Sequence, residues 1–284
     1  MKKKILLLCT ALAVLLPAGG CARQTPEHRL PENITQTKEH QYTCTFENES
    51  YSFILDLPEQ PDGAPLILML HGYGDSAEGF RSSVHLERQA NPLGYAVVYA
   101  SGGLGWNAGM DADDKPDREF LVSLADYLQE TYALDASRIY AAGFSNGACM
   151  AHRLAAEAPE TFSACVSVCG MMPARIRAEQ KQQPVGFFQI TGGKDAVVPK
   201  NSDGSAEHTD APAIEDVMDT YVQSAGLTLS ATEEAGRNGI LKKYSSPGSR
   251  KQVWDLFFPD GTHGWQCGGA DTCSLILEFL ETQK

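Results

Sequence analysis

A serine stands between two glycines in Gly143–Gly147, which reads G-F-S-N-G. Residues 138–142 have the apolar pattern of a buried strand, and residues 146–158 have the pattern of a helix. A strand-to-helix turn this tight exposes the serine hydroxyl above a sheet, and the flanking glycines relieve crowding around it. Ser145 is therefore the predicted nucleophile. The alternative is a glycine-bracketed turn with a solvated serine.

A serine hydroxyl is a weak nucleophile near neutral pH, so it needs a base. Three histidines follow Ser145 in the chain. His152 lies two turns away on the helix that follows Ser145 and is predicted to be a surface or packing residue, while His208 lies in a polar loop. His263 directly follows the strand-like segment 252–258 and is the predicted base.

The base needs an acid that holds its tautomer and stabilises the imidazolium. Asp195 directly follows the apolar run Val185–Thr191, so it is placed at the end of a strand and is the predicted acid. The other candidates are interpreted as solvated surface charges: Asp203, Asp210, Asp216 and Asp219.

The segment Leu70–Ser76, L-H-G-Y-G-D-S, follows another buried strand. Its loop can bring the backbone N–H of Tyr73 beside that of Asn146, and the two would form an oxyanion hole. His71 is interpreted as a structural residue that holds this loop, because His263 is better placed as the base.

Buried strands and helices alternate along the chain. This order predicts βαβ units, and hence a mainly parallel sheet with helices on both faces, in one domain from 41 to 284 with little or no lid. The expected strands are Gln41–Phe46 and Tyr51–Leu57 (a hairpin), Pro65–His71, Tyr95–Ala100, Arg138–Gly143, Ala164–Cys169, Val185–Thr191 and Gln252–Phe258; the expected helices are Glu119–Tyr132, Asn146–Ala158, Ala213–Ala225 and Cys273–Thr282.

The N-terminal residues 1–20 read as a secretory signal: a basic start, the apolar run Ile5–Leu16 and a Pro-Ala-Gly-Gly end. Cys21 then stands where a bacterial lipoprotein is lipidated. Residues 21–40 are polar and are interpreted as a tether. We therefore expect an exported protein anchored to the membrane only through Cys21; the alternative is plain secretion after ordinary signal cleavage.

The net charge of −13 argues against binding to nucleic acid or an anionic membrane surface and favours neutral substrates. No cysteine and histidine spacing indicates zinc, so no metal is expected. Export would permit disulfides. Cys267 and Cys273 flank a Gly-Gly turn and could form one, or remain two thiols, whereas Cys165 and Cys169 lie too far apart along one strand.

The motifs L-H-G-Y-G-D-S, G-F-S-N-G, G-G-K-D-A-V-V-P and G-T-H-G-W resemble those of the α/β-hydrolase esterases that include polyhydroxybutyrate depolymerases and feruloyl or acetylxylan esterases. The resemblance covers most of 50–282 and implies the α/β-hydrolase fold, a Ser145–Asp195–His263 triad and an oxyanion hole at Tyr73 and Asn146. No organic cofactor or metal is implied. The polar stretch 111–116 departs from the group and argues against polymer-surface binding.

Aromatic side chains near these motifs are candidates for substrate contact. Trp106 and Asn107 follow the strand Tyr95–Ala100, and Trp265 follows His263, so the rings could stack on a phenolic acyl group or a sugar. The alternative is that the tryptophans cover the core edge.

We therefore expect a serine ester hydrolase of the feruloyl or acetylxylan type, acting on a small-molecule or polysaccharide-linked ester. The alternatives are a hydroxyalkanoate depolymerase, a serine peptidase and a binding protein on an inactive scaffold.

Overall fold

The computed structural model describes residues 29–110, 114–179, 183–200 and 211–283. The predicted signal segment 1–20 and Cys21 lie outside the described residues, as do His208, Asp203 and Asp210.

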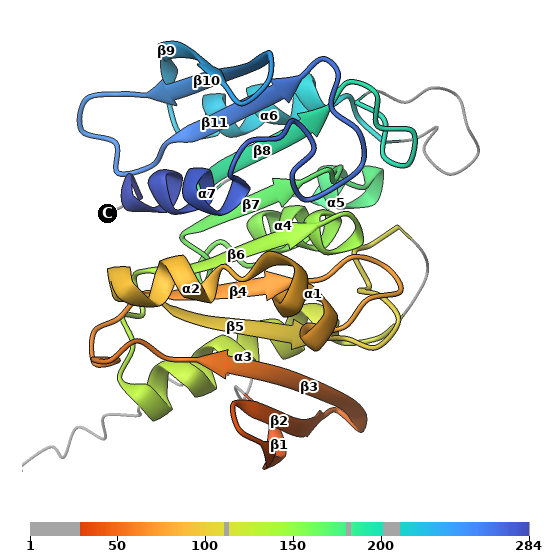
Figure 1. The fold of residues 1–284 in the computed structure, drawn as a ribbon, viewed down its shortest axis with the longest axis vertical. Helices are drawn as coiled ribbons and strands as arrows, with labels where there is room; N and C mark the ends of the chain where they lie inside the picture. The colour runs from red at the N-terminus through yellow and green to blue at the C-terminus, as the bar shows by residue number, and fades with distance from the viewer. Residues whose placement is uncertain (1–28, 111–113, 180–182, 201–210, 284) are drawn as a thin grey trace, which may run out of the picture.

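Six parallel strands form the centre of an eleven-stranded sheet (Figure 1). In spatial order they are β5 (Ala96–Ser101), β4 (Leu66–Leu70), β6 (Ile139–Phe144), β7 (Ala164–Val168), β8 (Gly186–Gly192) and β11 (Val253–Phe258). Leu66–Leu70 is fully buried, as a strand covered on both faces must be. The parallel central sheet predicted from the apolar runs is confirmed.

Antiparallel strands extend both edges of the sheet. On one side lie β3 (Glu49–Asp56), β2 (Gln41–Phe46) and β1 (Glu32–Lys38); on the other lie β10 (Gly239–Ser245) and β9 (Thr228–Ala235). The predicted tether 21–40 is wrong at its second half, because Glu32–Lys38 pairs with β2. The side chains of this strand are mostly polar and exposed, so no apolar pattern marks it in the sequence.

Helices cover both faces of the sheet (Figure 1). On one face lie α3 (Asp117–Tyr132), α4 (Asn146–Glu157), α5 (Ala174–Glu179) and α6 (Ile214–Ser224); on the other lie α1 (Ala77–Val84), α2 (Glu87–Ala90), the short 3-10 turn η1 (Asn91–Leu93) and α7 (Thr272–Glu281). Successive side chains of β4 point to opposite faces of the sheet. Leu66, Leu68 and Leu70 pack in the core on the α4 face, while Ile67 and Met69 pack in the core on the α7 face.

The parallel strands all end at one edge of the sheet, and their loops meet there. The loops after β4, β6, β8 and β11 carry Tyr73, Ser145, Asp195 and His263 respectively.

Within the described ranges, no helix has both the length and the apolar character needed to cross a membrane.

Candidate active site

Ser145 sits in a strained turn between β6 and α4. Its φ of 55° and ψ of −118° lie outside the regions that side-chain-bearing residues prefer. A Cβ on Gly143 would lie 2.1 Å from the carbonyl oxygen of Gly147, and one on Gly147 would lie 2.2 Å from that of Leu70. Only glycine fits at these positions, so the G-x-S-x-G spacing is a packing requirement of the turn.

Ser145, His263 and Asp195 form one hydrogen-bonded chain. His263 Nε2 lies 2.9 Å from Ser145 Oγ, and His263 Nδ1 lies 2.8 Å from Asp195 Oδ2. Asp195 as acceptor makes Nδ1 the protonated ring nitrogen, which leaves Nε2 free to accept a proton from the serine hydroxyl. The structure thus brings together the three residues predicted from separate strand ends.

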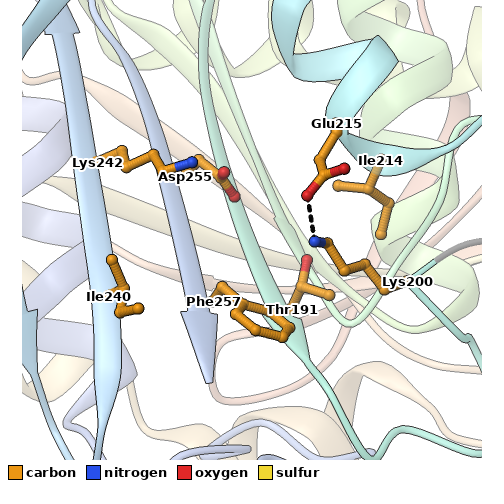
Figure 2. Close-up of a pocket in the computed structure, with 8 residues that line it drawn as sticks. All are labelled: Thr191, Lys200, Ile214, Glu215, Ile240, Lys242, Asp255 and Phe257. Carbon is orange, nitrogen blue, oxygen red and sulfur yellow. Dashed lines mark hydrogen bonds and ion pairs between the residues drawn. The ribbon is translucent and has the colours of Figure 1, made fainter. Parts of the chain in front are cut away.

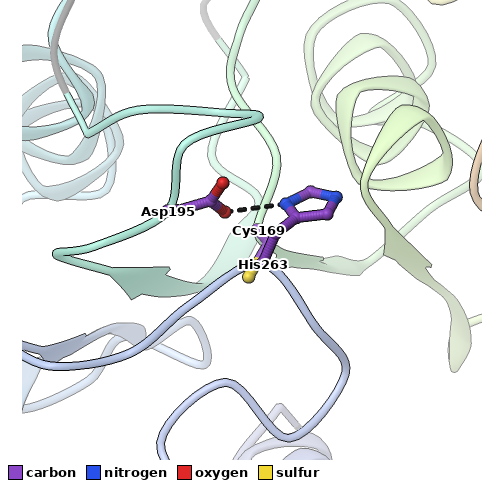
Figure 3. Close-up of side chains that lie close together, drawn as sticks. All are labelled: Cys169, Asp195 and His263. Atoms are coloured by element: carbon purple, nitrogen blue, oxygen red, sulfur yellow. Dashed lines mark hydrogen bonds and ion pairs between the residues drawn. The ribbon is translucent and has the colours of Figure 1, made fainter.

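The carboxylate of Asp195 is buried and fixed by further donors. Burial acts to raise its pKa, but the hydrogen bond from His263 and those from the backbone N–H groups of Val198 and Val197 outweigh it and hold the pKa below the ordinary value. Figure 3 shows the carboxylate aimed at the imidazole. The side chain is therefore held as an anion.

The first turn of α4 and the loop after β4 meet beside Ser145. Asn146 begins α4, so its N–H is among the helix amides without an intrahelical partner. A Cβ on Gly72 would lie 3.4 Å from the Ser145 Cβ, which shows how closely the segment before Tyr73 approaches the serine. The oxyanion hole at Tyr73 and Asn146 stays a prediction, and the Asn146 N–H is free of helix bonding for that role.

The Asn146 side chain ties the loop after β5 to this turn. Its Oδ1 accepts from the Trp106 N–H at 2.6 Å, and its Nδ2 donates to the Trp106 carbonyl at 3.2 Å. The Trp106 indole N–H donates to the carbonyl of His71 at 3.1 Å. Sequence reasoning used only the backbone of Asn146 and missed this side-chain role.

Trp106 and Asn107 do not line an open substrate surface, so their predicted role in substrate contact is wrong. Trp106 is 4% exposed and packs against His71. Asn107 is 7% exposed; its N–H donates to Asp117, and its carbonyl accepts from Arg153. Both residues hold the loop in place. For Trp106 this agrees with the alternative interpretation, in which the tryptophan covers the edge of the core.

His71 and His152 are packing residues. Burial lowers the pKa of both, to about 3 for His152. His71 Nδ1 hydrogen-bonds the Gly72 carbonyl, and His152 bonds Gln189 and Tyr221. Their positions agree with the roles expected from sequence. Two of the other candidate acids, Asp216 and Asp219, are exposed on α6, as expected.

Trp265 is half-buried, and its ring meets Phe80 edge-on at 5.3 Å. The large apolar side chains that are exposed near the site are instead Tyr73 (71%), Leu104 (63%) and Val197 (55%), which we call the apolar rim. They follow β4, β5 and β8, and the Gly74 N–H donates to the Leu104 carbonyl, so two of these loops are joined. Sequence reasoning missed the rim, because exposure cannot be read from residue type.

The disulfide considered between Cys267 and Cys273 is not formed. Both are free thiols, and the Cys273 Sγ instead faces the Val84 carbonyl at 3.5 Å. The Cys267 thiol lies against Cys169. Cys169, Asp195 and His263 could each offer one ligand atom to a metal ion, and these atoms lie within 4.8 Å of one another. Asp195 and His263, however, already belong to the hydrogen-bonded chain with Ser145.

A hollow of about 150 Å³ lies between the sheet and α6 (Figure 2). Lys200 pairs with Glu215 inside it. Burial raises the pKa of Asp255 there, partly offset by Lys242 and Lys200. None of the three residues of the Ser145 chain lines this hollow. Its lining residues are Thr191, Lys200, Ile214, Glu215, Ile240, Lys242, Asp255 and Phe257.

The sheet with its parallel centre, the strained serine turn and the Ser–Asp–His order together define an α/β hydrolase. The sequence profile of the alpha/beta hydrolase fold matches residues 65–265, so the chain belongs to this family. The fold predicted from the sequence is confirmed.

The chain is similar to several esterases. "Putative esterase NocK" of Nocardia uniformis subsp. tsuyamanensis is 28% identical over 91% of this chain and 89% of its own length. The bifunctional acetylxylan esterase/xylanase XynS20E of Neocallimastix patriciarum is 29% identical over 48% of this chain. Feruloyl esterase B of Thermothelomyces thermophilus is 31% identical over 38%. This chain spans only 20% and 40% of the length of these last two proteins.

Among solved structures, an acetyl xylan esterase from Aspergillus awamori superposes with a TM-score of 0.60 at 15% identity, over 82% of this chain and 94% of its own, which shows a shared fold. The sequence matches confirm the resemblance to feruloyl and acetylxylan esterases and place the chain among carboxylic ester hydrolases.

Proposed function

We propose that the protein is a serine carboxylic ester hydrolase that works through an acyl-enzyme, with a substrate of the feruloyl or acetylated-xylan type. The observation that carries the proposal is the Ser145–His263–Asp195 chain, with contacts of 2.9 and 2.8 Å. The names of the feruloyl and acetylxylan esterase relatives support the substrate class.

In this mechanism Ser145 Oγ attacks the ester carbonyl as His263 Nε2 takes its proton. The oxyanion forms beside the N–H groups of Tyr73 and Asn146, where each donor typically lowers the barrier by about 3 kcal/mol. His263 then returns the proton to the leaving alcohol. Water repeats the sequence on the acyl-enzyme, and Asp195 stabilises the imidazolium in both halves.

The apolar rim of Tyr73, Leu104 and Val197 supports an ester with an aromatic or alkyl part. An exposed tyrosine ring offers a face for a phenolic acyl group, and such ring pairs typically contribute about 0.5–1.5 kcal/mol. The Tyr73 ring and the Asn146 side chain lie against the same glycine: a Cβ on Gly105 would be 2.8 Å from the ring and 3.2 Å from the Asn146 side chain.

The substrate class is tested with a panel of methyl ferulate, acetylated xylan, p-nitrophenyl acetate and hydroxybutyrate oligomers. Among these four substrates, we expect the highest kcat/KM on methyl ferulate or acetylated xylan. Selective hydrolysis of hydroxybutyrate oligomers would instead assign a depolymerase, and cleavage of peptides alone would assign a peptidase.

We further propose export and a lipid anchor at Cys21, supported by the basic start and the apolar run Ile5–Leu16. A labelled fatty acid fed to producing cells should enter the wild-type protein and not Cys21→Ala. Equal labelling of both proteins would contradict the anchor.

A further inference from the structure

Cys169 lies where β7 ends, beneath the loop that carries His263. It is 2% exposed, and its φ of 53° is unusual for a side-chain-bearing residue. Its N–H donates to the Ile190 carbonyl on β8 at 2.9 Å, which anchors it to the sheet. Its Sγ lies 3.6 Å from the carbonyl of Gly264, the residue after His263. Figure 3 shows Cys169 close to His263. Cys169 thus joins the rigid sheet to the histidine loop.

Cys267 closes the same loop. Its carbonyl accepts from the Thr262 N–H at 3.3 Å, so residues 262–267 form a turn with His263 inside it. Its thiol lies against that of Cys169. The two sulfurs therefore meet across the base of the catalytic loop, with one on the sheet and the other on the loop.

We propose that Cys169 and Cys267 are a reversible disulfide site that fixes the His263 loop to the end of β7. Cys267 is half-buried and accessible, whereas Cys169 is buried, so a small-molecule disulfide first meets Cys267. The Cys267 thiolate attacks one sulfur of that reagent and expels a thiolate. Cys169 then loses its proton and attacks the Cys267 Sγ, which expels the second thiol. The protein loses two hydrogen atoms, and the reagent is reduced to two thiols.

The electrostatics of the pair support this order of attack. The neighbouring Cys169 thiol lowers the pKa of Cys267, while the same contact and burial raise the pKa of Cys169. Cys273 is a poor competitor: its thiol is buried against the Val84 carbonyl, and burial raises its pKa to about 11.

The bond would act on catalysis through position, a consequence that rests on the proposed esterase function. His263 must keep both its 2.9 Å contact with Ser145 and its 2.8 Å contact with Asp195. A covalent tie at Cys267 limits loop motion that would lengthen them. Cys169 and Cys267 are thus positioning residues.

The chemical test is peptide mass spectrometry of the native protein after incubation with oxidised glutathione or with dithiothreitol. Oxidation should join the tryptic peptides that span residues 154–175 and 252–284. Each peptide holds a second cysteine, so the assignment uses variants: Cys169→Ser and Cys267→Ser should lose the link, and the control Cys273→Ser should keep it. Free alkylation of both thiols after oxidation, or loss of the link in Cys273→Ser, would overturn the proposal.

The positioning role is tested by the ratio of kcat/KM between oxidised and reduced enzyme. We expect reduction to lower kcat/KM roughly 3- to 10-fold, mainly through kcat, because small displacements of reacting groups cost rate steeply. Cys169→Ser and Cys267→Ser should stay at the reduced level under both conditions, and Cys273→Ser should respond like the wild type. A disulfide that forms without changing kcat would contradict the positioning role. The mass measurement stands whether or not the protein hydrolyses esters.

Discussion

Replacing Asp195 by asparagine tests how the carboxylate sets the state of His263. Asp195 Oδ1 accepts from the N–H groups of Val197 and Val198 at 2.9 and 2.8 Å. An asparagine would keep its oxygen at that position, because an NH2 group there would face two donors. Its NH2 then points at His263 Nδ1, which must become the acceptor, so Nε2 carries the proton and cannot take one from Ser145.

The wrong tautomer typically costs about 10⁴ in kcat, which corresponds to roughly 5.4 kcal/mol of barrier. The assay is the initial rate on p-nitrophenyl acetate. The matched control is Asp219→Asn, an exposed position on α6, which should change kcat less than about twofold since surface changes away from the site are usually near neutral.

The same variant should change how stability depends on pH. The pKa of Asp195 is below its ordinary value of 3.8 in the folded protein, so its ionised form stabilises the fold above that pH. This contribution is lost as the pH falls through the lowered folded pKa, and Asp195→Asn has no such contribution. Near pH 7 the variant should still fold, because the two backbone hydrogen bonds remain possible. A folded variant that keeps more than about a tenth of wild-type kcat would refute the assignment of the acid.

Three further changes test the turn, the loop and the rim. Gly147→Ala should lower stability by roughly 3 kcal/mol or more in thermal unfolding, because its Cβ would meet a backbone oxygen at 2.2 Å. The control Gly264→Ala has open space at its Cβ and should keep the wild-type stability. Equal melting temperatures for the two variants would contradict the packing argument. Asn146→Ala removes two hydrogen bonds and should lower kcat more than it raises KM; an unchanged kcat would show that the loop needs no tie. Tyr73→Ala should raise KM for methyl ferulate about 2- to 10-fold with little change in KM for acetylated xylan. Equal changes for both substrates would show that the Tyr73 ring does not recognise the acyl group.

The centre of the fold could be predicted from the sequence because burial on both faces leaves continuous apolar runs such as Leu66–Leu70. The edge strands could not: β1 and β9 keep most side chains in solvent, so neither alternation nor an apolar run marks them. Edge strands are held by backbone pairing, which side-chain type does not report.

The triad residues could be predicted because each follows a strand of the parallel sheet, where chain order implies a shared edge. Trp106 could not be assigned, since its indole bond to the His71 carbonyl depends on how two loops pack. The partner of Cys267 likewise depends on contact between the end of β7 and a loop distant in sequence, so sequence spacing could suggest only the nearby Cys273.

The most direct test of the central claim is to trap the acyl-enzyme. Protein mixed with methyl ferulate or p-nitrophenyl acetate is quenched in acid within its first turnovers, and peptide mass spectrometry locates the added acyl group. We expect a feruloyl or acetyl group on Ser145 alone, and none in Ser145→Ala, which should also lose several orders of magnitude in turnover. Acylation of another residue, or ester hydrolysis that persists in folded Ser145→Ala, would contradict it.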